Sequence, residues 1–213
     1  MANQTIDVYK SLKENIIKGI YSPSESLPEL ELSKQYGVSR NTIKKALLML
    51  EKESLVMIEI NKGAKVRSYS MEEVLEFLEL RSCLEGFIIR KAVPVISDEN
   101  IEALEEILAT MKHHFEHHEL VAYSECNQRF HGLIYDACPN KTAVEMTQSL
   151  KNQMRKYNTK TILIPGRDNQ SFSEHSAILG AIKNRDAELA EALMVRHINN
   201  VRTTFENNYA LLF

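Results

Sequence analysis

The chain has 213 residues, of which 44% are hydrophobic and 26% charged, and its formal net charge is −3. These values are ordinary for a globular protein, and the length allows one large domain or two small ones. The sequence has no signal-peptide pattern and no apolar run long enough to cross a membrane, so we expect a cytoplasmic protein without a membrane partner. Three cysteines without CxxC spacing agree with reduced thiols.

Charge is divided unevenly along the chain. Residues 1–70 hold 11 lysines and arginines against 8 acidic residues, a net charge of +3. Residues 71–213 hold 15 against 21, a net charge of −6. This division suggests that the N-terminal part meets a polyanion and that the remainder does not.

The N-terminal part predicts short helices followed by a β-hairpin. Apolar residues recur at helical spacing over residues 5–19, and a second helix is expected over residues 28–36. Gly37 ends that helix, and Ser39 is a suitable N-cap for a third one. The segments LVMIEI and AKVRSY follow, rich in β-branched residues, and they predict a hairpin with its turn at residues 61–63.

This order of elements predicts a winged helix-turn-helix, whose second motif helix can enter the DNA major groove. Arg40 lies in the first turn of that helix, where two guanidinium donors can pair with guanine, and Asn41 can reach adenine or a phosphate. The lysines suit phosphates, and the hydroxyl side chains are candidate contacts to the DNA backbone. The alternative is a solvated charged face, but the turn, the arginine and the hairpin in this order favour DNA. The candidate DNA-binding residues are Ser39, Arg40, Asn41, Thr42, Lys44 and Lys45.

Residues 19–66 resemble the DNA-binding domain of the GntR family of bacterial transcription regulators. The resemblance rests on the segment LSKQYGVSRNTIKKAL, the exit L-x-x-E-x-L-V and the wing motif G-x-x-V. It implies that Arg40 and Lys44 contact DNA, together with the wing tip at Lys62 and Gly63. The family usually has arginine at position 44, and a lysine there forfeits a bidentate contact, so the preferred DNA sequence is expected to differ.

From position 71 onward the pattern is helical throughout. We therefore expect a mainly α protein, with a winged helix-turn-helix of three helices and a hairpin over residues 1–69 and an all-α bundle of six to seven helices over residues 70–213. The predicted helices of the bundle are 71–92, 98–118, 119–137, 141–158, 172–184 and 186–209, with caps at Ser97, Ser173 and Asp186.

Three histidines lie on apolar faces of three different predicted helices, at His131, His175 and His197. Asn127 precedes His131 by four residues and shares its face. A single imidazole on such a face is usually a core residue. Three of them with an amide oxygen, however, form a ligand set suited to Zn²⁺ or Ni²⁺. We therefore predict a divalent metal site made of these four residues.

A second histidine-rich motif is the run HHFEHH at residues 113–118. It resembles a metal site in composition, but it lies near a predicted helix end. We interpret it as a surface feature without a functional metal.

Residues 71–213 resemble the FCD ligand-sensing domain of the FadR subfamily of GntR regulators, on the segments LELRSCLEG, NQRFHGLIYDACPN and SEHSAILGAIKNRDAELAEALMVRH. The resemblance implies a metal held by an aspartate and three histidines, with Asn127 in place of the aspartate, and an organic-acid effector beside it. Arg81 matches an arginine that faces the cavity and can bind a carboxylate, and Asn152 and Arg155 are further candidates. The alternative for Arg81 is a salt bridge with Glu85.

These observations predict a regulator, most often a repressor in this family, that binds operator DNA as a homodimer and responds to a small carboxylate in a metal-containing domain. Two alternatives remain open. The metal can be purely structural, with no effector. Three histidines can also activate water on a metal, as in a hydrolase. Because the sequence places no acidic general base beside the histidines and attaches a DNA-binding part, we expect that the protein is not an enzyme.

Overall fold

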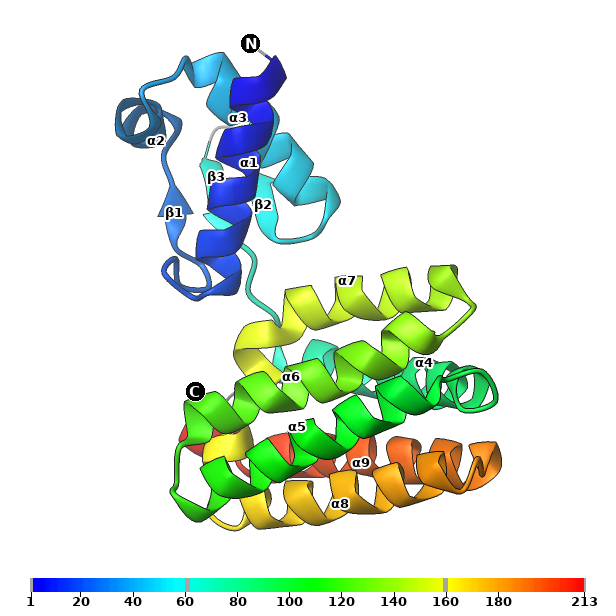
Figure 1. Cartoon of the computed structure of the whole chain (residues 1–213). Helices are drawn as coiled ribbons and strands as arrows, with labels where there is room; N and C mark the ends of the chain where they lie inside the picture. Colours follow the sequence, from blue (N-terminus) through cyan, green and yellow to red (C-terminus); the bar gives the residue numbers. More distant parts are fainter. Residues whose placement is uncertain (1, 60–61, 159–160, 213) are drawn as a thin grey trace. The chain divides into compact units, whose positions relative to one another are not determined.

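The computed structural model divides the chain into two compact units, Met1–Ser70 and Met71–Phe213, which we call the head and the body (Figure 1). It describes residues 2–59, 62–158 and 161–212, without the side chains at positions 2, 3, 155, 156 and 158. Within these residues no helix has both the length and the apolar character needed to span a membrane. The predicted fold class, a winged helix-turn-helix followed by a helical bundle, is confirmed.

The helices of the head are α1 (Ala2–Ile17), α2 (Glu29–Tyr36) and α3 (Arg40–Lys52). Gly37 ends α2 in the left-handed conformation, with φ of 63°, and its amide donates to the Lys34 carbonyl. The next amide reaches back to residue 33, which completes a Schellman motif. The predicted N-cap of α3 at Ser39 is confirmed, because the Ser39 hydroxyl accepts a hydrogen bond from the Thr42 amide at 3.2 Å. The turn between α2 and α3 is thus closed from both sides.

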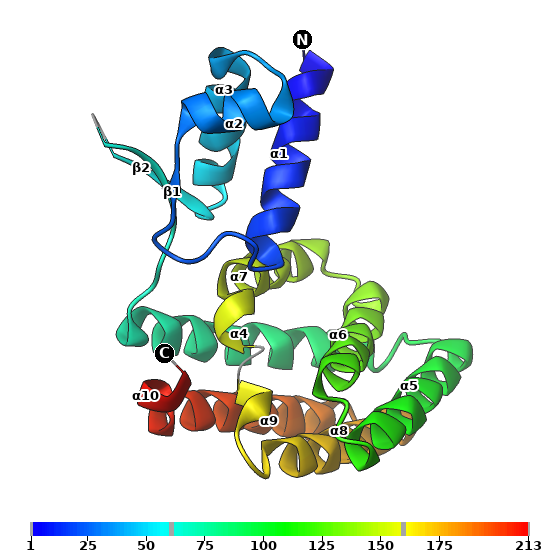
Figure 2. The ribbon, with the colours of Figure 1, turned by 90° about the vertical axis from the view of Figure 1, so that its left-hand side faces the viewer.

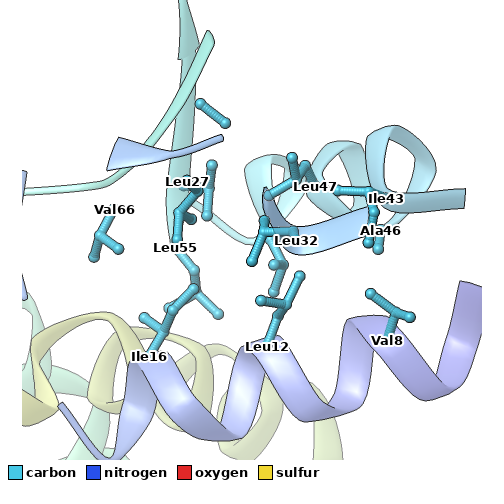
Figure 3. Close-up of a cluster of buried hydrophobic side chains, with 13 residues drawn as sticks. Val8, Leu12, Ile16, Leu27, Leu32, Ile43, Ala46, Leu47, Leu55 and Val66 are labelled. Carbon is cyan, nitrogen blue, oxygen red and sulfur yellow. The ribbon is translucent and has the colours of Figure 1, made fainter. Parts of the chain in front are cut away.

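The core of the head lies between α1, α3 and the sheet (Figure 3). Removing a large aliphatic side chain from water contributes about 1.5–3 kcal/mol, so this cluster fixes which side of α3 faces inward. The opposite side of α3 is left at the surface. The central members of the core are Val8, Leu12, Ile16, Leu27, Leu32, Ile43, Ala46, Leu47 and Leu50.

The sheet of the head has the order β1-β3-β2, with β1 at Ser26–Leu27, β2 at Val56–Glu59 and β3 at Gly63–Val66. Strands β2 and β3 form the predicted antiparallel hairpin, in which Val56 pairs with Val66. Strand β1 was not predicted, because two residues carry no readable alternation of polar and apolar side chains. The first residue of the predicted turn, Asn61, lies outside the described residues.

The body consists of α-helices joined by short connections and one 3₁₀ turn, η1. Helix α4 packs along α9, and α5 packs against both α6 and α8 (Figure 2). The bounds are α4 Met71–Ala92, α5 Asp98–Glu116, α6 Leu120–Ala137, α7 Lys141–Asn158, η1 Thr161–Leu163, α8 Arg167–Lys183, α9 Ala187–Asn207 and α10 Tyr209–Leu212.

Three helix ends in the body differ from the prediction by two residues or more. Helix α5 ends at Glu116, two residues before its predicted end. Helix α8 begins at Arg167, after Gly166 with φ of 81°, so Ser173 lies inside the helix and the predicted cap there is wrong. The first turn of α8 is polar, and apolar periodicity therefore gave no sign of it. Helix α9 ends at Asn207, and the short α10 follows as a separate element. The caps at Ser97 and Asp186 are confirmed, since both side chains accept from a first-turn amide.

Candidate functional site

Helix α3 presents a polar face opposite its buried one. Arg40, Asn41, Lys44 and Lys45 are all exposed. Thr42 is the exception among the predicted DNA contacts: it is buried, and its hydroxyl lies 2.9 Å from that of Ser39. Its side chain therefore supports the start of α3 and does not belong to the exposed face.

Three of the basic groups at the surface of the head have acidic neighbours within the head itself. The Arg40 guanidinium lies 3.5 Å from Glu29, and Lys62 lies 3.3 Å from Glu59 at the wing. Lys65, which the sequence did not single out, also pairs with Glu59. Because these pairs are at the surface, each contributes little to stability and can be exchanged for a phosphate at low cost.

In the body the three predicted histidines come together. His131 on α6, His175 on α8 and His197 on α9 are all buried, and one ligand atom from each lies within 4.8 Å of the other two. The Nε2 atoms of His131 and His175 are 3.3 Å apart. The packing of α6, α8 and α9 thus brings together imidazoles from distant parts of the sequence.

Nδ1 of each imidazole lies close to a group that only accepts hydrogen bonds, and the contact of His131 with Glu85 is the one of the three without hydrogen-bond geometry. Glu85 Oε2 lies 2.8 Å from His131 Nδ1, and Glu174 Oε2 lies 2.6 Å from His197 Nδ1. His175 Nδ1 donates to the Ser171 carbonyl at 2.6 Å. A neutral imidazole carries one proton, and in His175 and His197 it lies on Nδ1, which leaves Nε2 bare. His131 Nε2, 3.3 Å from His175 Nε2, can instead donate between the two rings, and a metal would replace that proton. Carboxylates in this position are the usual outer partners of metal-binding histidines.

Burial keeps the three imidazoles neutral. It lowers the pKa of His131 to about 4, that of His175 to about 3 and that of His197 to about 4. Burial alone would raise the pKa of Glu174, but the hydrogen bond from His197 and the charge of Arg167 lower it to about 2. The site therefore pairs ionised carboxylates with neutral nitrogen ligands, as divalent metals require.

Asn127 lies one turn before His131 on α6, and its Oδ1 is buried without a hydrogen-bond partner. Leaving a buried acceptor unpaired costs about 1–3 kcal/mol, so a metal ion, an effector or a water molecule is expected to bind this oxygen. Asn127, His131 and His197 line one cavity of the body, with a volume of about 130 Å³. This volume is several times what a single water molecule needs, so the cavity can admit a small organic acid.

The predicted effector residues differ in their positions. Arg81 and Asn152 both line the cavity. Arg81 is also ion-paired with Glu85, so the salt bridge that was the alternative for this residue is present. The side chain of Arg155 lies outside the part of the chain that the structure describes.

Arg167 is a cavity residue that the sequence did not reveal. It is buried at the start of α8, and its Nη2 donates to Glu174 Oε2 at 2.9 Å. Its Nη1 is buried without a partner. Glu174 also accepts a hydrogen bond from Asn200 at 2.7 Å. This one carboxylate therefore links Arg167 to two residues of α9, His197 and Asn200. The sequence carried no signal for Arg167, and the position of Glu174 next to His175 did not reveal that its carboxylate contacts His197.

In comparisons with known proteins, each of the two units matches a protein-family model. The model of the FCD domain matches residues 76–200, and the model of bacterial regulatory proteins of the gntR family matches residues 4–66. The HTH-type transcriptional repressor RspR of Escherichia coli (strain K12) is 23% identical over 194 residues, which cover 91% of this chain and 85% of RspR. The gluconate operon transcriptional repressor of Bacillus subtilis (strain 168) is 21% identical over 211 residues, which cover 97% of this chain and 86% of that protein.

The fold has a solved counterpart in E. coli McbR/YncC. The TM-score is 0.78 at 20% identity, with 97% of this chain and 99% of that chain covered. The expectation that no acidic group lies beside the histidines is wrong, because Glu85 and Glu174 contact His131 and His197. The hydrolase alternative is nevertheless unsupported, since the matched families and the relatives are transcription regulators and not enzymes. This chain is therefore a DNA-binding transcription regulator that belongs to the bacterial GntR family and carries an FCD domain as its body.

Proposed function

We propose that the protein represses transcription from an operator, and that a small carboxylate bound beside a divalent metal in the body changes its affinity for that operator. The observation that carries this proposal is the meeting of three buried imidazoles from α6, α8 and α9, with the unpartnered amide oxygen of Asn127 one turn before His131. Two relatives named as repressors support the sign of the regulation.

The head would supply the DNA contacts from the exposed face of α3 and from the wing. Arg40 reads a guanine, and the lysines bind phosphates. Two heads of a homodimer would grip two half-sites of a pseudo-palindromic operator, because a twofold protein matches twofold DNA. The residues of this interface are Ser39, Arg40, Asn41, Lys44, Lys45, Lys62 and Gly63.

The metal would be held by Asn127, His131, His175 and His197. Three imidazole nitrogens and one oxygen suit Zn²⁺ or Ni²⁺. When bound, the ion supplies a positive charge that attracts a carboxylate. Asn127 adds an oxygen without a negative charge, so the site keeps more of the ion's charge available to an effector than an aspartate would leave.

Arg167 is the residue best prepared to hold the carboxylate of an effector. Its Nη1 is a charged donor that is buried without a partner, while Arg81 is already ion-paired with Glu85. A carboxylate at Nη1 would satisfy that donor with a charge-assisted hydrogen bond. Asn152 also lines the cavity and can bind a polar group of the ligand. The name of the gluconate operon repressor supports the carboxylate class, since gluconate is a sugar acid.

Helix α4 offers a route from the cavity to the head. It begins at Met71, where the head ends, and it carries Arg81 and Glu85. Glu85 in turn holds His131, so a change in metal or effector bears directly on this helix. An effector alters operator binding only if it prefers one of two arrangements of the dimer.

The DNA-binding assignment can be tested by fluorescence anisotropy. The protein is titrated into labelled DNA from the region upstream of its own gene, at a series of salt concentrations. Arg40→Ala should weaken specific binding by about 1–3 kcal/mol and relax base preference. Lys44→Ala should weaken binding to all sequences and lower the salt slope by about one unit. Lys183→Ala, a change of the same charge in the body, is the control. Specific binding that survives Arg40→Ala would mean that α3 is not the recognition helix.

A further inference from the structure

The corner between α5 and α6 carries a second group of metal-ligating side chains. It includes part of the run at residues 113–118, which the sequence alone had led us to interpret as a surface feature without a metal, and the position of Glu119 is what changes that interpretation. His113 and His114 lie in the last turn of α5, and Glu119 directly precedes α6. One ligand atom from each of the three lies within 4.8 Å of the other two. None of them lines the cavity of the body, so this group is separate from the interior histidines.

Hydrogen bonds already orient the side chains of this corner. His114 Nδ1 lies 2.6 Å from Glu119 Oε2. His117 Nδ1 donates to the His113 carbonyl at 2.8 Å, which leaves its Nε2 bare because a carbonyl only accepts. The rings of His113 and His117 are 4.2 Å apart, so a fourth possible ligand stands beside the group. Neutral imidazoles and one carboxylate are a ligand set for Zn²⁺, Ni²⁺ or Cu²⁺.

The helix end suits a cation and is anchored from its other side. The last carbonyls of α5 give this end a partial negative charge. Phe115, in the same turn, stacks on Phe172 of α8 with 6.0 Å between ring centroids. The backbone is thus fixed by packing, while His113 and His117 are exposed to solvent. A cation can therefore arrive from solvent and needs only side-chain rotations to be bound.

We propose that this corner is a second divalent-metal site, on the surface, with His113, His114 and Glu119 as ligands and His117 as an additional one. The metal replaces the hydrogen bond between His114 and Glu119 and ties the end of α5 to the start of α6. Because α6 carries Asn127 and His131, occupancy of the outer site stiffens the helix that supplies two ligands of the inner one. The exposed position makes the outer site the weaker of the two.

The test is a Zn²⁺ titration of the full chain in competition with a chromophoric chelator. The wild-type protein should bind two equivalents with separate affinities. The double variant His114→Asn with Glu119→Gln, which changes one half-buried and one exposed side chain outside the cavity, should lose the weaker equivalent and keep the tighter one. The matched control is His118→Asn, a neighbouring exposed histidine outside the group, whose φ of 56° is a conformation that asparagine accepts. This variant should keep both equivalents.

Other outcomes of the Zn²⁺ titration would contradict either the outer site or the inner site. Equal stoichiometry in the wild type and the double variant would overturn the outer site, as would a loss in His118→Asn as large as in the double variant. If only the inner site fails, the wild type binds one equivalent and the double variant none. Hydrogen exchange checks the bracing role: Zn²⁺ should slow exchange in the first turns of α6 in the wild type, and unchanged exchange there would contradict it.

Discussion

Asn127 brings a neutral oxygen to a cluster of neutral nitrogens, and a single substitution can add the missing charge. A unit charge pair 4 Å apart contributes about 4 kcal/mol at an effective dielectric constant of about 20. Burying the carboxylate offsets part of this gain. We therefore expect Asn127→Asp to tighten metal binding by about tenfold, equivalent to about 1.4 kcal/mol. Isothermal titration would measure the change, and Asn127→Ala should weaken binding. Unchanged affinity in both variants would remove Asn127 from the ligand set.

Some residues of the cavity could be predicted from the sequence, and others could not. His131, His175 and His197 could be predicted as a group because each stands on an apolar helix face, and Asn127 followed from helical spacing. Arg167 and the roles of the buried glutamates could not be predicted. Their meaning depends on which helices pack together, and local spacing does not contain that information.

At the scale of elements, two substitutions at the N-cap of α3 can distinguish its contribution to the stability of the head from its contribution to DNA affinity. Ser39→Ala removes the acceptor of the Thr42 amide and should destabilise the head by about 1 kcal/mol. Ser39→Asp keeps a capping oxygen, so the head should keep its stability, but the added negative charge would face the phosphates. Denaturant unfolding and DNA titration measure the two effects. Wild-type DNA affinity in Ser39→Asp would show that this end of α3 does not approach DNA.

The pairing of α4 with α9 depends on a residue without a side chain. A Cβ at Gly86 would lie 2.6 Å from Val195 Cγ2, and valine has little freedom to move away. Overpacking costs about 1–3 kcal/mol, which exceeds the gain of at most about 1 kcal/mol from alanine in a helix. We expect Gly86→Ala to destabilise the body by about 1 kcal/mol in denaturant unfolding.

The control for this prediction is Gly180→Ala on α8. A Cβ there meets nothing within 4 Å, so alanine should stabilise the body by about 0.5–1 kcal/mol. Equal effects of the two substitutions would show that close approach of α4 and α9 is not what requires Gly86.

Predictability of the elements followed the strength of their patterns. Helices α4 and α7 have the predicted bounds, because their ends coincide with clear breaks in the sequence. The first turn of α8 and strand β1 were missed, since a polar turn and a two-residue strand carry no periodicity. Both are fixed by tertiary contacts: Leu27 in β1, for example, pairs with Ala64 in β3.

At the scale of the whole molecule, the head and the body have opposite charges and separate cores. The head has the basic surface that DNA requires, and the body has the polar cavity that a ligand requires. What joins the two functions in our account is the chain that runs from the head into α4, and from α4 through Glu85 to His131. Regulation therefore requires that a ligand of the cavity distinguish two states of the dimer.

The most direct test of that claim is the affinity of the full chain for DNA from its own upstream region, measured with chelator, with Zn²⁺, and with Zn²⁺ plus acetate, succinate, citrate or D-gluconate. We predict specific binding at low ionic strength, and a change of at least about fivefold with one of the carboxylates. Arg167→Gln should bind DNA normally and lose that response. The account is contradicted if the protein does not bind this DNA, or if neither the metal nor any of the carboxylates changes the affinity of the protein for it.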